Sequence, residues 1–196
     1  LIAWSVLALV LAGMWLAFAL HPLPGKGFDY HAVGVPPQWA VAPADWIRGG
    51  FAGHWNMNTN AAAAFDRWFL NFFPRPVPFR FNSGGYCTLN IVTTLGTMLM
   101  GWIGGCVLLS NRPTRWRMGW FAAAGIAAMA LGIVLDATGV CPMVKRIWTP
   151  SWTLFSGGLC FLVLAAFHFI CDVMEIRGLF LPLVVLGANS MAAYMV

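Results

Sequence analysis

The stretch AGHWNMNTNAAAAFDRWFLNFF, residues 52–73, gathers polar side chains that could do chemistry between two strongly apolar lengths of chain. Asn60 and Asp66 could face a pocket together with His54 and offer hydrogen-bond donors and acceptors to a polar substrate. His54 could also serve as a general base or as a metal ligand. Because no HxH, HExxH or CxxC spacing accompanies this histidine, we expect no metal site.

The same stretch has the alanine content of a helix, with Thr59 or Asn60 as its N-cap and Pro74 as its stop. Such a helix could instead lie on the membrane surface, with Asp66 and Arg67 solvated. Its apolar stripe would then consist of Ala62, Phe65, Phe69 and Phe72. The residues alone leave the substrate pocket and the surface helix both open.

A second polar stretch, CPMVKRIWTPSWTLFSGG, occupies residues 141–158. Lys145 could bind an anionic group, and Ser151 could line a polar path into a helix bundle. Alternatively, Trp148 and Trp152 belong to an aromatic belt at the membrane interface, and Lys145 extends its ammonium group to lipid headgroups. The composition of the stretch does not choose between these interpretations.

Polar residues also lie within apolar runs. Asn90 lies near the start of one run and could reach the loop that precedes it. Asn189 and Ser190 lie inside another run, where a polar pair commonly hydrogen-bonds a neighbouring helix.

Charged and thiol side chains mark the ends of other runs. Asp136 needs water or a partner, because a carboxylate near hydrocarbon is costly, and Lys145 or Arg146 could be that partner. Cys87 and Cys141 lie at segment ends that could share the oxidising side of a membrane, so a disulfide between them is left open.

The composition is that of a membrane protein. Of the 196 residues, 60% are hydrophobic and only 9% are charged, whereas about a quarter of a soluble domain is charged. A membrane-spanning helix needs about 20 mostly apolar residues. Five stretches come close, at about 1–20, 88–109, 119–135, 151–170 and 179–196. The sequence therefore predicts an all-α, polytopic transmembrane helical bundle.

The short loops indicate how this bundle is oriented. The loop 110–118 carries Arg112, Arg115 and Arg117 and no acidic residue, as is typical of the cytoplasmic side. The long segment 21–87 is then extracytoplasmic, and its Trp and Tyr content argues for an ordered, partly helical cap rather than disorder. We expect an integral protein of a bacterial inner membrane. Its Lys and Arg residues are scattered, so the lipid bilayer is the expected partner and nucleic acid is not.

Both ends of the sequence, Leu1 and Val196, lie inside apolar runs. We therefore expect the sequence to be part of a single transmembrane domain that has further spans upstream.

Four segments, in this order, resemble the heparan-alpha-glucosaminide N-acetyltransferase family and its bacterial relatives. They are NTNAAAAFDRWFL, GGYCTLNIVTTLGTMLMGWIGG, CPMVKRIWTPSWTLFSGG and GANSMAAYM. The resemblance covers roughly residues 50–196, and the third segment is the most specific. Two departures leave the acceptor open: Val144 stands where the family often has Asn, and RFNSGGYC lacks the family's Asp-Pro-Glu-Gly.

The resemblance implies a membrane-embedded acyltransferase that moves an acetyl group from cytoplasmic acetyl-CoA, as co-substrate, to an extracytoplasmic amino sugar or related glycan. The family's catalytic histidine is expected upstream of Leu1, and none of the four histidines here matches its motif: His21, His31, His54 and His168.

The resemblance also assigns roles to residues of this chain. Asn60 and Asn90 would orient the acyl oxygen or the acceptor, and Asp66 and Arg67 would brace the cap. Lys145, Trp148 and Ser151 belong to the cleft, and Asn189 and Ser190 to the last motif. Arg112, Arg115 and Arg117 could attract the phosphates of CoA, although a cytoplasmic loop would carry them in any case.

Two other functions remain open. The protein could use the same scaffold without catalysis and bind a glycan or a protein partner through its cap, which the departures in RFNSGGYC favour. A transporter would need broken helices in both halves of a repeat, and only Pro182 interrupts a predicted span. A homodimer is also left open.

Overall fold

The computed structural model describes residues 2–36, 47–176, 178 and 181–188, and within these ranges the regular elements are all helical. The α-helices are α1 (Ile2–Ala19), α3 (Ala61–Phe69), α4 (Asn90–Leu108), α5 (Thr114–Ala137), α6 (Pro150–His168) and α7 (Leu181–Ala188). Short 3-10 turns lie at Tyr30–Val33, Gly50–Trp55, Leu70–Phe72 and Lys145–Ile147, and a π-helical turn at Phe169–Val173. The predicted all-α class is confirmed.

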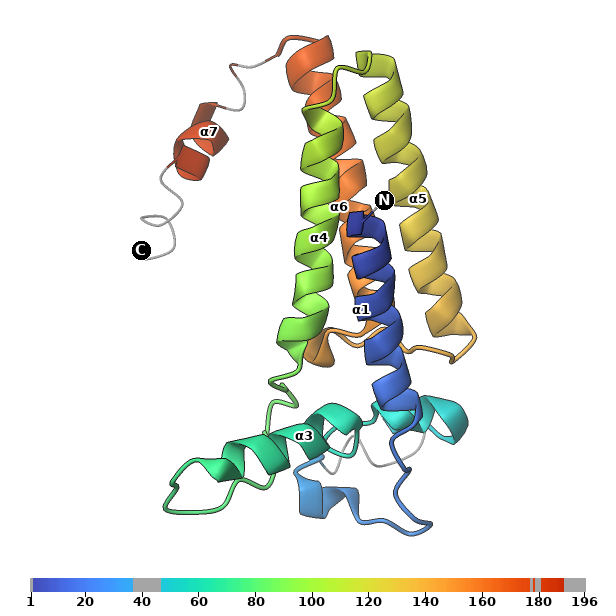
Figure 1. Cartoon of the computed structure of the whole chain (residues 1–196), viewed down its shortest axis with the longest axis vertical. Coiled ribbons are helices and arrows are strands. Elements are labelled where there is room, and N and C mark those ends of the chain that lie inside the picture. Colours follow the sequence, from blue (N-terminus) through green and yellow to red (C-terminus); the bar gives the residue numbers. More distant parts are fainter. Residues whose placement is uncertain (1, 37–46, 177, 179–180, 189–196) are drawn as a thin grey trace.

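Four of the described helices are long and apolar enough to cross a membrane: α1, α4, α5 and α6 together with its π turn. Figure 1 shows these four side by side, with the segment 21–87, called the cap below, across one end of the bundle. Helix α3 runs across that end, while the turn between α4 and α5 lies at the opposite end. Most of the fifth predicted span, 179–196, lies outside the described residues.

Glycines bring α5 and α6 into close contact. A methyl group added to Gly158 would lie 2.6 Å from the carbonyl oxygen of Gly125, and one added to Gly132 would lie 2.8 Å from that of Ser151. Helices in lipid gain little from burying apolar surface against each other, so small residues that let the backbones approach provide the packing energy. The α5–α6 pair is accordingly the most extensive helix contact in the bundle.

Helix α5 begins earlier than the hydropathy pattern predicts. It starts at Thr114, directly after Pro113, rather than near residue 119. The reason is that its arginine-bearing first turn is itself helical, and Arg117 Nη1 donates a 2.8 Å hydrogen bond to the carbonyl oxygen of Leu108. A hydropathy pattern does not detect a helical turn that carries charged residues.

The cap packs on the bundle through a small apolar core. Phe18, at the end of α1, stacks on Trp55 of the cap with ring centroids 6.1 Å apart. Around this pair gather the buried residues Met14, Ala62, Ala63, Cys87, Cys141 and Ile147, which come from α1, the cap and the loop before α6. This shared core fixes the cap against the loop that forms the candidate site.

Candidate functional site

A cavity of about 490 Å³ lies between the cap and the turn before α6. Its apolar wall consists of Trp55, Met57, Gly85, Pro142, Met143, Val144 and Ile147, and its polar wall of Arg48, Asn56, Lys145 and Arg146. No acidic residue is among these described lining residues. We call it the basic cavity.

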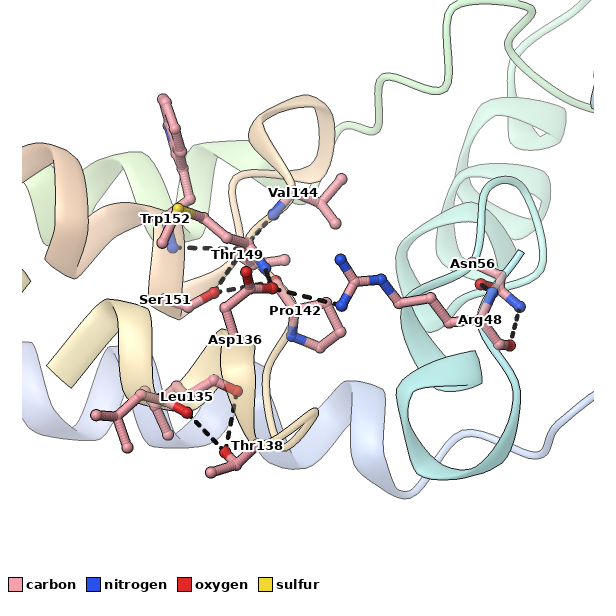
Figure 2. Close-up of polar contacts among 12 residues, drawn as sticks. Arg48, Asn56, Leu135, Asp136, Thr138, Pro142, Val144, Thr149, Ser151 and Trp152 are labelled. Atoms are coloured by element: carbon pink, nitrogen blue, oxygen red, sulfur yellow. Dashed lines mark hydrogen bonds and ion pairs between the residues drawn. The ribbon is translucent and has the colours of Figure 1, made fainter. Parts of the chain in front are cut away.

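Asp136 joins the cap to the loop before α6. One of its carboxylate oxygens, Oδ1, accepts a 2.8 Å hydrogen bond from the backbone N–H of Met143 and lies 3.4 Å from Nη1 of Arg48 (Figure 2). The predicted ion pair of Asp136 with Lys145 or Arg146 is therefore wrong. Arg48 reaches the carboxylate from the cap, 88 positions away in the chain, and no local sequence pattern signals such a pair.

Hydroxyl groups at the start of α6 fix the 142–149 loop from inside. Thr149 is the N-cap of α6, and its Oγ1 also accepts a 3.0 Å hydrogen bond from the N–H of Val144 (Figure 2). Ser151 Oγ donates to the carbonyl oxygen of Pro142 at 3.0 Å. Thr149 and Ser151 are almost completely buried, so these hydrogen bonds form away from bulk solvent.

Helix α4 fixes the same loop from outside. Asn90 Nδ2 donates a 2.7 Å hydrogen bond to the carbonyl oxygen of Arg146, and Trp148 Nε1 donates a 3.0 Å bond to Thr97 Oγ1. The backbone of Trp148 is left-handed, with φ of 49°. Bulky residues rarely adopt this conformation, and such strain persists where the surroundings impose it and is common at functional sites. The result is a rigid turn that carries Lys145 on the wall of the basic cavity.

Within the cap, buried asparagines bind the backbone. The Asn56 side chain accepts from the N–H of Arg48 at 2.8 Å and donates to the carbonyl oxygen of the same residue at 2.9 Å. Asn60 caps α3 by accepting from the N–H of Ala63, as predicted, and its Nδ2 donates to the carbonyl oxygen of Asn56 at 2.9 Å. The repeated asparagines of NMNTN were the sequence signal for this network, in which the importance of Asn56 was missed.

Asp66 and Arg67 also bind the backbone. Both carboxylate oxygens of Asp66 accept from the N–H of Thr88, each at 3.1 Å, and Arg67 Nη1 donates to the carbonyl oxygen of Asn58 at 3.0 Å. Asp66 is 3% exposed, so the prediction of a solvated carboxylate is wrong. The inward face of α3 can contain Asp66 because the N–H of Thr88 donates to both oxygens of this carboxylate.

The aromatic side chains of α3 and of the 3-10 turn that follows it pack on one another. Phe65 is stacked on Phe69 at 5.4 Å, and Trp68 lies against Phe72 at 4.9 Å. Ala62 is buried and Phe72 is 65% exposed. Because the apolar stripe of a membrane-surface helix would face lipid, that interpretation of the stripe stays a prediction.

None of the described residues that line the basic cavity is a histidine or a cysteine. His54 Nδ1 donates to the carbonyl oxygen of His21 at 2.8 Å, and burial, followed by the nearby Arg67 and His54, lowers the pKa of His21. Burial, reinforced by the Asp66 carboxylate, raises the pKa of the Cys87 thiol to about 12. Burial also raises the pKa of Cys141. Both cysteines are free and protonated at neutral pH, and a protonated thiol is a poor nucleophile.

The predicted substrate residues fall into three groups. Lys145 lines the basic cavity. Asn60, Asp66 and Arg67 hold the cap together, and Asn90, Trp148 and Ser151 hold the loop. Asn189 and Ser190 lie outside the described residues. Direct contact of these residues with a substrate stays a prediction.

The opposite end of the bundle carries the three arginines predicted to attract CoA. Arg112 lies over the ring of Trp116 at 5.4 Å and lines an open cavity of about 690 Å³ between α1, α4 and α5. Arg117 is bonded to the turn between α4 and α5, and Arg115 is exposed. Near the same end, at the end of α6, His168 Nδ1 pairs with Asp172 at 2.6 Å.

Together, the fold and the site define an all-α membrane protein with a cap that covers a basic cavity at one end of its bundle. The chain is 24% identical, over 205 aligned residues, to human heparan-alpha-glucosaminide N-acetyltransferase. The alignment covers 96% of this chain and 29% of the human protein, so the chain spans less than a third of that relative's length. No family model matches the chain. No solved structure matches it either. The similarity supports the family resemblance suggested by the four sequence segments.

Proposed function

We propose that this chain is part of a membrane-embedded acyltransferase-like protein whose acceptor site is the basic cavity. The acceptor would be an amino sugar or a related glycan on the extracytoplasmic side, where we place the cap. The proposal is supported by the similarity to an N-acetyltransferase along 96% of the chain.

One structural observation carries the choice of site: the rigid turn that presents Lys145. The backbone before and after this lysine is bonded to α4, α5 and α6, and Trp148 accepts an unfavourable φ. Among the described residues, the ammonium group of Lys145 has no hydrogen-bond or ion-pair partner, although its backbone carbonyl accepts from the N–H of Trp148. A fixed backbone with an available ammonium group is what orienting a substrate requires, because little freedom is left to lose on binding.

Acetyl-CoA would be the acyl donor and would approach from the end opposite the cap. It would supply an activated acetyl thioester. Arg112 fits a role in attracting its phosphates, since this side chain lines an open cavity that also contains Trp4, Trp102 and Trp120. Arg117 is already bonded to the chain, which makes Arg115 and Arg112 the better candidates.

The first experiment asks whether acyl transfer occurs. Full-length protein in nanodiscs would be mixed with acetyl-CoA and a panel of amino sugars, and free CoA and acetylated sugar would be measured. We expect both products, and about tenfold less of each with Lys145→Gln, because an ammonium that hydrogen-bonds a substrate contributes roughly 1.5 kcal/mol or more.

Lys26→Gln is the matched control, since Lys26 is exposed on the cap and does not line the basic cavity. Absence of both products with the unaltered protein would remove the acyltransferase proposal. Equal activity of the Lys145 and Lys26 variants would remove Lys145 from the site.

A non-catalytic protein that binds a glycan is the second candidate. The observation that favours it is the chemistry of the cavity wall: none of the described lining residues is a His, Cys, Asp or Glu that could act as base or nucleophile. Saturable glycan binding without release of CoA would select this function over the first.

A further inference from the structure

The basic cavity has a charge that an uncharged sugar would leave uncompensated. Arg48, Lys145 and Arg146 line it, and none of its described lining residues is acidic. The carboxylate behind Arg48, Asp136, is also engaged with the N–H of Met143. A cavity lined by one sign of charge and by low-dielectric walls concentrates ions of the opposite sign.

The guanidinium and ammonium groups differ in how firmly they are held. Arg48 is anchored by Asp136, and Arg146 Nη1 donates to the carbonyl oxygen of Gly84 at 2.8 Å. The Lys145 side chain is exposed, and its ammonium group has no hydrogen-bond or ion-pair partner among the described residues. The wall therefore combines two positioned guanidinium groups with one adaptable ammonium, a set suited to an anion with several oxygens.

The other wall of the cavity is apolar. Trp55, Met57, Met143 and Ile147 would contact the organic part of a ligand rather than its charge. Trp55 also leaves a donor unused, since its Nε1 is buried and has no partner among the described residues. The Oδ1 of Asn90, whose Nδ2 donates to the carbonyl oxygen of Arg146, is likewise buried without a partner among the described residues, although Asn90 does not line the cavity. Unsatisfied polar atoms of this kind are costly and are common where a ligand completes a site.

We propose that the basic cavity binds a phosphate ester, with the phosphate held by Lys145 and the neighbouring arginines and the organic part packed on the Trp55 side. The inference rests on the proposed function, because it takes the basic cavity as the acceptor site. It adds that the acceptor carries a phosphate group. Two sources share this chemistry: a phosphorylated sugar in solution and the headgroup of a phospholipid or glycolipid at the membrane surface.

Binding can be measured without acyl transfer, with full-length protein in phosphatidylcholine nanodiscs. One arm titrates glucosamine 6-phosphate against glucosamine by calorimetry. The other arm replaces part of the phosphatidylcholine by phosphatidic acid and counts retained lipid by native mass spectrometry. We expect the phosphate-bearing probe of at least one arm to bind, and about tenfold weaker binding with Lys145→Gln. Lys145→Arg, which keeps the charge, should retain most of the affinity and shows that loss in the first variant is not a loss of fold.

Lys26→Gln and Arg80→Gln are the matched controls, because both residues are exposed on the cap and outside the cavity wall. Binding in the sugar arm alone identifies a soluble ester, and binding in the lipid arm alone identifies a headgroup. The inference is overturned if neither phosphate-bearing probe binds. It is also overturned if only the sugar arm responds and glucosamine binds as tightly as glucosamine 6-phosphate. The third contrary outcome is that the control substitutions weaken binding as much as Lys145→Gln does. Phosphate binding without release of CoA would contradict the proposed acyl transfer and leave this inference intact.

Discussion

Polar side chains hold the cap end of the molecule together, whereas close backbone contact holds α5 against α6. At the cap end, Asn56, Asn60 and Asp66 each bind backbone groups from another part of the chain or from a neighbouring turn. Between α5 and α6, by contrast, Gly125 and Gly158 leave no room for a side chain. The cap end can lose single hydrogen bonds separately, whereas one added side chain between α5 and α6 would disturb the packing of both helices.

The difference follows from the surroundings of each region. In the unfolded chain these polar groups bond to water instead, so each hydrogen bond of the cap contributes only about 1 kcal/mol net and many are needed. In lipid the apolar surfaces of two helices gain little from meeting, and dense packing has to supply the stability. Four predictions test this difference between the two regions.

The largest effect is expected from Gly158→Val. The new Cβ would lie 2.6 Å from the carbonyl oxygen of Gly125 and 2.8 Å from the backbone nitrogen of Met129, and backbone cannot move aside cheaply. We expect a loss of about 3 kcal/mol of unfolding free energy or more, seen as a lower melting temperature in detergent. Gly101→Val is the control, because no atom lies within 4 Å of that position. Equal melting temperatures for the two variants would show that α5 and α6 are not packed through glycine.

Asp66→Ala should have the next largest effect. It removes the buried carboxylate that accepts from the N–H of Thr88, which costs about 2 kcal/mol of unfolding free energy. Asp29→Ala removes the same charge from an exposed residue that caps a 3-10 turn and should cost less, about 1 kcal/mol. Limited proteolysis of the cap and thermal unfolding would measure both. If Asp29→Ala proved the more damaging, the view that buried polar bonds hold the cap would fail.

Alkaline pH should loosen the cap through Cys87. The pKa of its thiol is raised from 9.0 to about 12 in the folded protein, so between these values the unfolded chain has released a proton that the folded chain keeps. The contribution of this thiol to the free energy of unfolding is fully present below pH 9. It falls by up to about 1.4 kcal/mol per pH unit as the pH rises toward 12. Chemical denaturation at pH 8, 9 and 10 would show a steeper decline for the unaltered protein than for Cys87→Ala. If the free energy of unfolding fell equally with pH in both proteins, the Cys87 thiol would not be buried by the cap.

The smallest effect concerns the bond between Trp148 Nε1 and Thr97 Oγ1. A double-mutant cycle of Trp148→Phe and Thr97→Val should give a coupling energy of about 1 kcal/mol, because the two groups share one hydrogen bond. Pairing Thr97→Val with Trp152→Phe should give additive effects, since the buried Nε1 of Trp152 has no partner among the described residues. Additivity in the first cycle would indicate that α4 does not fix the loop.

Local patterns predicted the helices well. Hydropathy located four spans, and the capping preference of Asn60 located the start of α3, because these signals depend on residues close in the chain. The site depends on contacts between distant residues. Arg48 meets Asp136 across 88 positions, and Asn90 meets the carbonyl of Arg146 across 56.

The left-handed backbone of Trp148 was also outside the reach of sequence reasoning. An aromatic residue carries no preference for that conformation, which the tertiary contacts impose. The motif that contains Lys145, Trp148 and Ser151 drew attention to the loop, but only the folded chain distinguishes the residue on the cavity wall from those that hold it.

The glycine contact between α5 and α6 has a consequence for how the protein is made. These two helices are consecutive in the chain and are joined by a short loop, so they can associate as a hairpin as soon as both have entered the membrane. The hydrogen bond from Trp15 Nε1 to the carbonyl oxygen of Val140 spans 125 positions and cannot form before the chain beyond α5 has been made, and the loop that lines the basic cavity lies between α5 and α6. We therefore expect the cap and its basic cavity to form late in biosynthesis, after the last of these helices has been inserted.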